Sequence, residues 1–297
     1  MFEGIYTALI TPLRGSEKGV DHDALAALVE RQIAAGIHGL VPCGTTGESA
    51  TLKTDEKLAI FRTVIEAARG RCKIVAGVGT NDTAASIELA RAALELGADG
   101  GLAVTPYYNK PGPEGLYHHY RAIAEQAPGL PLVLYNVPSR TGISLTIDVI
   151  DRLADVPGIV AIKEATGNIV FDAEIIARIG DRLTVLSGDD AVAFPLFCLG
   201  GRGVICVASN VVPERMVALW KAFEAGELET ARRIHLQLLP LFVGLFVESN
   251  PVPVKTLCAW SSKGLNAMVR LPLVPLQPSN EARLRVLAQE FGLLGST

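Results

Sequence analysis

The sequence predicts an α/β protein, namely a (β/α)8 TIM barrel with a small C-terminal helical appendage. Three observations predict this class: short apolar runs alternate with amphipathic segments, the alternation repeats eight times, and capping residues mark many boundaries. Strands that alternate with helices pair in parallel, because each crossover helix returns the chain to the same end of the sheet. Eight such units close into a barrel of about 250 residues.

The predicted strands are short and apolar, as expected for strands that are buried on both faces. They span residues 4–10, 38–42, 72–78, 100–105, 131–136, 159–163, 183–187 and 203–207. A helical stripe follows each strand; in 54–69 it consists of Leu58, Phe61 and Ile65. The predicted helices span residues 21–35, 54–69, 82–96, 113–126, 145–154, 168–179, 190–199 and 213–225.

Capping residues support these helix boundaries. Thr54 stands before two acidic residues, and Asp82 stands where the third helix opens. Gly36, Gly70 and Gly97 follow the last apolar residues of three helices, where glycine commonly ends a helix.

The residues after the eighth strand are too many for one closing helix. Three more amphipathic helices are predicted, at 227–247, 253–263 and 279–291. We therefore expect a catalytic barrel over residues 1–225 and a helical region over residues 226–297. A doubly wound open sheet is the alternative, but its first strand is normally followed by a phosphate-binding glycine loop. Residues 10–13, Ile-Thr-Pro-Leu, form no such loop.

Composition argues against several classes of function. The net charge is −4 and no basic block stands out, so a nucleic-acid interface is not expected. No apolar run approaches the roughly 20 residues of a membrane span, and the first residues lack the features of a signal peptide. We expect a cytoplasmic protein. Five scattered cysteines and no pair of histidines at i, i+4 spacing predict neither a disulfide framework nor a metal site.

Lys163 is the first catalytic candidate. It ends the apolar run that begins at Gly158, where a buried strand meets a loop. Burial lowers the pKa of an ammonium group, and a neutral lysine is a nucleophile toward carbonyls. The alternative is a lysine that forms an ion pair with a neighbouring carboxylate such as Glu164.

The other candidates follow neighbouring strands, because catalytic groups of such barrels sit at the C-terminal ends of the strands. Thr45 and Thr46 lie between two glycines after the second strand, and such a loop can bind a small carboxylate through its N–H groups and hydroxyls. A plain tight turn is the alternative.

Tyr135 ends the strand before Lys163, and Arg140 lies in the following loop. A phenol can relay protons and an arginine fork can bind a carboxylate. A tyrosine that packs in the core and a solvated arginine are the alternatives. Together the candidates indicate Schiff-base chemistry on a 2-oxo acid.

Six strings then show a resemblance to the 4-hydroxy-tetrahydrodipicolinate (dihydrodipicolinate) synthase family of the pyruvate-dependent class I aldolases, from Ile5 to at least Lys255. They are GTTGESATL from Gly44, TPYYNKP from Thr105, YNVPSRTG from Tyr135, IKEATGN from Ile162, LSGDDA from Leu186 and ESNPVPVK from Glu248.

The resemblance implies a lyase that condenses pyruvate with L-aspartate 4-semialdehyde, the first committed step toward diaminopimelate and lysine. It implies that Lys163 forms the Schiff base and that Tyr135 shuttles protons with Thr45 and Tyr108. Thr46 and Thr45 would hold the pyruvate carboxylate. Pyruvate bound covalently would serve without any cofactor or metal.

The resemblance also implies a binding role for Arg140, which would receive the carboxylate of the aldehyde. The Ile205 backbone would face the site, and Gly188 would contribute to substrate binding. Tyr108 would reach into a neighbouring subunit, so a homodimer or homotetramer is expected.

Two other functions stay open at this point. A related aldolase, such as an N-acetylneuraminate lyase or a 2-keto-3-deoxy acid aldolase, would share the lysine and the tyrosine, but Arg140 and the tyrosine pair Tyr107-Tyr108 argue for the synthase. A barrel that binds a 2-oxo acid without catalysis is the other. The sequence leaves open whether Cys43 makes the protein sensitive to thiol reagents.

The family's lysine-inhibition site is only partly present. The residues that fit the inhibited members are Ser49, Asn81 and Tyr107. Thr54 and Lys57 stand where these members have histidines, and Ala85 stands where they have a glutamate. A cation at Lys57 would repel the ammonium groups of L-lysine, so weak or absent inhibition is expected.

Overall fold

A computed structural model describes residues 2–294. Eight strands form a closed barrel in the order β1-β10-β9-β8-β7-β6-β5-β4, which confirms the predicted TIM barrel. The strands are β1 (Gly4–Ala8), β4 (Gly39–Val41), β5 (Lys73–Gly77), β6 (Gly100–Val104), β7 (Leu132–Asn136), β8 (Ile159–Glu164), β9 (Thr184–Ser187) and β10 (Gly203–Cys206). By their internal packing, the described residues fall into two compact units, one of residues 2–6 and 73–206 and the other of residues 7–72 and 207–294.

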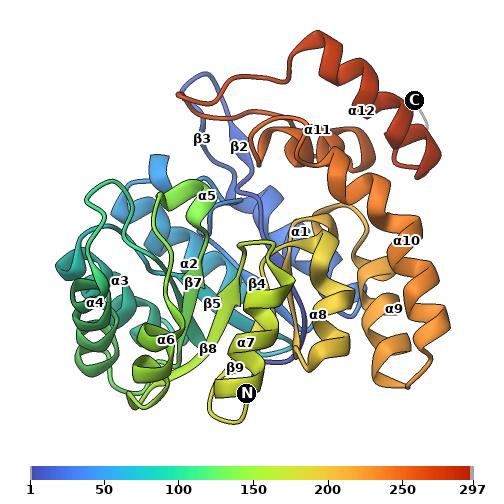
Figure 1. Cartoon of the computed structure of the whole chain (residues 1–297). Coiled ribbons are helices and arrows are strands. Elements are labelled where there is room, and N and C mark those ends of the chain that lie inside the picture. Colours follow the sequence, from blue (N-terminus) through green and yellow to red (C-terminus); the bar gives the residue numbers. More distant parts are fainter. Residues whose placement is uncertain (1, 295–297) are drawn as a thin grey trace. The chain divides into compact units, whose positions relative to one another are not determined.

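The first unit holds a run of parallel strands covered by helices. Neighbouring strands β5 to β10 pair in parallel, and almost every residue of β6 to β10 is buried. Its helices are α3 (Thr83–Glu95), α4 (Pro113–Gln126), α5 (Pro138–Thr141), α6 (Ile147–Ala154), α7 (Ile169–Ile179) and α8 (Ala193–Leu199). The five longer helices pack one against the next in chain order, and α3, α6 and α8 contact β6, β8 and β10 (Figure 1).

The second unit contains the C-terminal helices. Its helices are α1 (His22–Ala34), α2 (Thr54–Ala68), α9 (Pro213–Glu224), α10 (Leu228–Gly244), α11 (Val252–Ser261) and α12 (Pro278–Glu290). Helices α9 and α10 run side by side, and α12 packs against α10 and α11 (Figure 1). All three helices predicted after α9 are confirmed; the division at residue 225 stays a prediction.

Some local features differ from the expectation. A small antiparallel hairpin of β2 (Leu13–Arg14) and β3 (Gly19–Val20) and the four-residue helix α5 were not predicted, because such short elements show no periodicity. Helix α2 begins at Thr54, but the free N–H of Lys53 is satisfied by the carboxylate of Glu56 at 2.9 Å rather than by a threonine cap. Asp82 caps α3 as predicted, because its side chain accepts from the Ala84 N–H.

Within residues 2–294 no helix combines the length and the apolar character that a membrane crossing needs.

Candidate active site

Lys163 lies on β8 and is 5 % exposed. Parallel pairing places it beside Tyr135 on β7, in register. Its Nζ atom lies 4.4 Å from the centroid of the Tyr135 ring. The structure therefore places the Lys163 amine against the Tyr135 ring of the neighbouring strand.

Glu164 does not pair with Lys163, because successive side chains of a strand point to opposite faces. Its carboxylate accepts hydrogen bonds from Asn136 Nδ2 at 3.0 Å and from both the N–H and the hydroxyl of Thr166, the latter at 2.7 Å. Within residues 2–294 Lys163 forms no ion pair. The alternative reading of Lys163 as half of an ion pair with Glu164 is thus wrong.

A second acid, Asp172, lies near Glu164. Asp172 lies in the first turn of α7 and is 1 % exposed. Burial, the contact with Glu164 and the charge of Asp189 raise the pKa of Asp172 to about 8. We therefore expect Asp172 to bind a proton at pH values where an ordinary aspartate has lost it.

Gly188 leaves the room that Lys163 needs. Its N–H donates to the Glu164 carbonyl at 2.6 Å, which brings the β9 end close to β8. A Cβ at this position would lie 3.0 Å from Lys163 Cε and 2.6 Å from the Ala165 Cβ. Ile205 lies on β10 and is buried.

Arg140 and Tyr108 lie on exposed segments. Arg140 belongs to α5, which begins at Pro138 directly after β7 and ends at Gly142 with φ 73°. Tyr108 is 88 % exposed and has a left-handed backbone with φ 71°. An exposed aromatic ring on a strained backbone is uncommon and often functional.

The second unit carries the Thr45-Thr46 loop after β4. Thr46 is 3 % exposed, and its hydroxyl accepts a hydrogen bond from Asn250 Nδ2 at 2.9 Å. Among residues 2–294 the N–H groups of Thr45 and Thr46 and the Thr46 hydroxyl proton have no acceptor. Unused donors in a nearly buried loop suit an anion such as a carboxylate.

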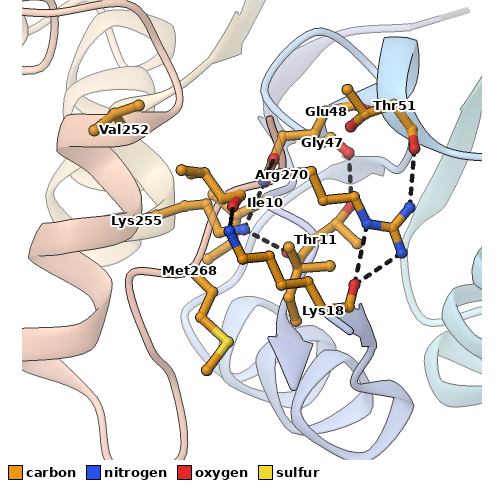
Figure 2. A network of polar contacts seen from close by, with 12 residues as sticks. Ile10, Thr11, Lys18, Gly47, Glu48, Thr51, Val252, Lys255, Met268 and Arg270 are labelled. Atoms are coloured by element: carbon orange, nitrogen blue, oxygen red, sulfur yellow. Dashed lines mark hydrogen bonds and ion pairs between the residues drawn. The ribbon is translucent and has the colours of Figure 1, made fainter. Parts of the chain in front are cut away.

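A buried ion pair lies directly beyond this loop. Glu48 has a left-handed backbone with φ 57°, and its carboxylate lies 2.6 Å from Lys255 Nζ (Figure 2). The Arg270 N–H donates to the other oxygen of Glu48 at 3.0 Å. Lys255 also donates to the Thr11 carbonyl, and the Thr11 hydroxyl donates to the Gly47 carbonyl at 2.7 Å.

The Arg270 guanidinium extends the same network. It donates to the carbonyls of Lys18 and Thr51, as Figure 2 shows. It also pairs with Glu56, whose pKa it lowers to about 2. The loop from Thr46 to Thr51 is thus held from both ends by residues more than 200 positions later in the chain.

Cys43 precedes this loop and is 2 % exposed. Burial raises the pKa of its thiol far above the usual value, so the reactive thiolate is scarce. We therefore expect slow reaction with thiol reagents. Among the described residues no group of histidine, cysteine and carboxylate side chains has the arrangement of a metal site.

The residues of the expected lysine-inhibition site are divided between the two units. Lys57 on α2 is 9 % exposed, and burial lowers its pKa. Ser49 begins a short 3-10 helix (Ser49–Thr51) in the same unit. In the first unit, Asn81 accepts a hydrogen bond from Asn109, and Ala85 on α3 and Tyr107 are half-buried.

Sequence reasoning assigned no role to several residues of these networks. They are Asn136, Thr166, Asp172, Asn250, Lys255 and Arg270. One signal was available: Lys255 is the one charged residue of α11, and a lysine in a largely apolar helix needs a partner if it is buried. Asp172 gave no such signal, because an acid in the first turn of a helix is ordinary.

Comparisons with known proteins identify the family of the whole chain. The profile of the Dihydrodipicolinate synthetase family matches residues 1–291. The 4-hydroxy-tetrahydrodipicolinate synthase of Nitratidesulfovibrio vulgaris (strain DSM 19637 / Miyazaki F) is 48% identical over 294 residues, which cover 99% of each chain. The crystal structure of dihydrodipicolinate synthase from Aquifex aeolicus superposes with TM-score 0.96 at 42% identity, covering 99% of this chain and 100% of that one. The chloride-inhibited enzyme from Acinetobacter baumannii, solved with pyruvate, has TM-score 0.96 at 41% identity, with coverage of 99% and 100%.

Proposed function

The chain belongs to the dihydrodipicolinate synthetase family, and on that premise we propose that it condenses pyruvate with L-aspartate 4-semialdehyde to 4-hydroxy-tetrahydrodipicolinate. This lyase reaction would be the first committed step toward diaminopimelate and lysine. The observation that carries the proposal is Lys163: a buried lysine without an ion pair among residues 2–294, in register with Tyr135 at the end of a barrel strand.

The reaction would begin when the Lys163 amine adds to the C2 carbonyl of pyruvate. The carbinolamine loses water to give a protonated Schiff base, which acidifies the C3 protons. Loss of one such proton gives an enamine, whose C3 attacks the aldehyde carbon of the second substrate. The amino group of that substrate then closes the ring on the Schiff-base carbon and displaces Lys163. Tyr135, as part of a relay with Thr45 and Tyr108, would carry the protons.

The remaining roles are proposed for groups outside the reacting bonds. The unused donors of Thr45 and Thr46 would bind the pyruvate carboxylate. Arg140 would bind the carboxylate of the aldehyde. Gly188 would leave space for the imine, and the Ile205 backbone would face it.

The first test is turnover of pyruvate with L-aspartate 4-semialdehyde, coupled to a reductase that consumes the product. Borohydride added in the presence of pyruvate should leave a reduced adduct on the Lys163 peptide. Lys163→Ala should lose both turnover and adduct, whereas Lys221→Ala, which removes an exposed lysine on α9, should keep both. An adduct on another lysine, or none in the folded wild type, would overturn the Schiff-base proposal.

Arg140 tests the identity of the second substrate. Arg140→Ala should raise the KM for the aldehyde roughly tenfold to a hundredfold, the range of one charge-assisted contact, and leave borohydride trapping of pyruvate unchanged. Should the wild type trap pyruvate but turn over only sugar acids, the related aldolase function would replace the synthase.

We propose further that the protein needs no cofactor, acts in the cytoplasm and self-associates as a homodimer or homotetramer. The exposed Tyr108 ring supports self-association, since a partner subunit would cover it. Activity that survives dialysis against a chelator would support the absence of a metal cofactor.

Self-association is tested by sedimentation and activity measurements on the wild type and Tyr108→Ala. A monomeric wild type with full activity would contradict self-association.

We also propose that L-lysine inhibits weakly or not at all. Ala85 gives the inhibitor's ammonium groups no counter-charge, and the Lys57 side chain stands where a histidine would be expected. Inhibition curves at fixed pyruvate measure this directly. A micromolar inhibition constant would contradict it.

A further inference from the structure

We propose that Asn250 is a positioning residue for pyruvate binding: its amide holds the Thr46 hydroxyl so that the hydroxyl proton is directed to the pyruvate carboxylate. This inference rests on the proposed function. It assigns a task in the reaction to the segment that joins α10 to α11, far from Thr46 in the sequence.

The direction of the hydrogen bond carries the argument. Asn250 Nδ2 donates to Thr46 Oγ1 at 2.9 Å, and both side chains are at least 95 % buried. An oxygen that accepts from an amide must point its own proton elsewhere. Since the Thr46 hydroxyl has no acceptor among residues 2–294, its proton is available to an anion beside the free N–H groups of Thr45 and Thr46.

Asn250 lies directly before α11, which begins two residues later. Lys255, one turn along this helix, binds Glu48 at 2.6 Å and the Thr11 carbonyl at 2.9 Å. The segment from Asn250 into α11 therefore contacts the Thr45-Thr46 loop region twice, through Asn250 at Thr46 and through Lys255 at Glu48. These two contacts fix the position of the Asn250 amide relative to the loop, so its N–H stays aligned with the Thr46 oxygen.

Asn250→Asp is the sharpest variant, because it keeps the shape and reverses the polarity. The Thr46 hydroxyl would then donate to the new carboxylate and be lost to pyruvate, and that carboxylate would repel the substrate anion. The KM for pyruvate should rise roughly tenfold to a hundredfold, the range of one charge-assisted hydrogen bond. Asn250→Ala, which lets the hydroxyl rotate, should raise it by about three- to tenfold.

A pH profile separates positioning from general damage. In Asn250→Asp the KM for pyruvate should fall again as the pH is lowered and the new carboxyl protonates, because a neutral acid can donate to Thr46 as the amide does. The wild type should not show this fall in KM at low pH. Asn266→Asp is the matched control: Asn266 is half-buried in the same unit and donates to the Leu13 carbonyl, so its KM and profile should stay those of the wild type.

A double-mutant cycle with Thr46→Val guards against a variant that folds poorly. If Asn250 acts through the Thr46 hydroxyl, Asn250→Ala should change the KM for pyruvate no further once that hydroxyl is gone. Additive effects, or a wild-type KM and pH profile in Asn250→Asp, would overturn the inference. Borohydride trapping on the wild type is run beside these variants, so a failure of the Schiff-base chemistry itself would be seen separately.

Discussion

Two buried glutamates follow residues of the candidate active site, and the protein stabilises them in different ways. Glu48, two residues after Thr46, faces a buried cation, Lys255. Glu164, directly after Lys163, accepts hydrogen bonds from neutral donors and lies near Asp172, an acid whose pKa is raised to about 8. Both carboxylates are buried within a few residues of the candidate active-site side chains. The two arrangements differ in how much stability a substitution should remove and in how that stability depends on pH.

The comparison shows two ways to satisfy a buried carboxylate. Among residues 2–294 no cationic side chain forms an ion pair with Glu164, and the neutral amide of Asn136 and hydroxyl of Thr166 donate to it instead. These donors satisfy Glu164 without adding positive charge. The Thr45-Thr46 loop has the opposite need, because it is proposed to bind an anion. There the pair of Glu48 and Lys255 is neutral as a whole and leaves the loop's donors free.

The largest expected effect comes from removing the cation. Lys255→Met should lower the free energy of unfolding by about 3–5 kcal/mol, because it leaves Glu48 buried and unpaired. Urea unfolding at fixed protein concentration measures the loss. Adding Glu48→Gln to Lys255→Met should recover much of it. If the double variant is no more stable than the single one, the loss arises from packing of the lysine stem rather than from charge.

The second prediction concerns the titration of Asp172 beside Glu164. Because the pKa of Asp172 is raised to about 8 in the fold, stability should fall as pH rises from about 4 toward 8 and stay level above that. Asp172→Asn removes the titrating group and keeps a donor for Glu164. It should match the wild type near pH 4 and be more stable than the wild type at pH 9. Parallel stability curves for the two proteins would contradict the raised pKa of Asp172.

A smaller effect is expected for the partly buried pair of Glu56 and Arg270. Its carboxyl pKa is lowered to about 2, so the pair stabilises the fold above the ordinary carboxyl pKa and is lost as pH falls through about 2. Glu56→Gln keeps the acceptor for the Lys53 N–H and should cost about 1–2 kcal/mol at pH 7, allowing for partial exposure. The difference from the wild type should shrink as pH falls below 4.5; a constant difference would assign it to packing.

The smallest effect is expected on the surface between α6 and α7, where Arg178 and Arg182 bind Asp151. These side chains are solvated, so the ion pairs are screened by water and salt. Arg178→Gln should leave the urea midpoint unchanged within error, at low and at high salt. A clear shift at low salt that salt abolishes would show that this cluster stabilises the helix pair.

Local pattern was enough for most of the fold. Each barrel strand and long helix could be predicted from its pattern of apolar residues. This pattern is local, because the buried stripe of a helix or the buried run of a strand lies within ten to fifteen positions. The same local rule placed Lys163 and Tyr135 at strand ends, and the barrel then put them in register. Elements of two to four residues, such as β2, β3 and α5, were not predicted because they are too short to show a periodic pattern of apolar residues.

The partners in the polar networks could be identified only from the tertiary structure. Asn250 and Thr46 are 204 positions apart, and Lys255 and Glu48 are 207 apart. The composition of α11 indicates a buried charge, yet nothing local names its partner, and Asp172 shows no sign that it will face Glu164. Periodicity reports which side of an element is buried, so the sequence alone determined the barrel with its eight strands and long helices, and it named Lys163 as the candidate nucleophile. Which buried polar groups meet depends on the distance and orientation of whole elements, and only packing decides that.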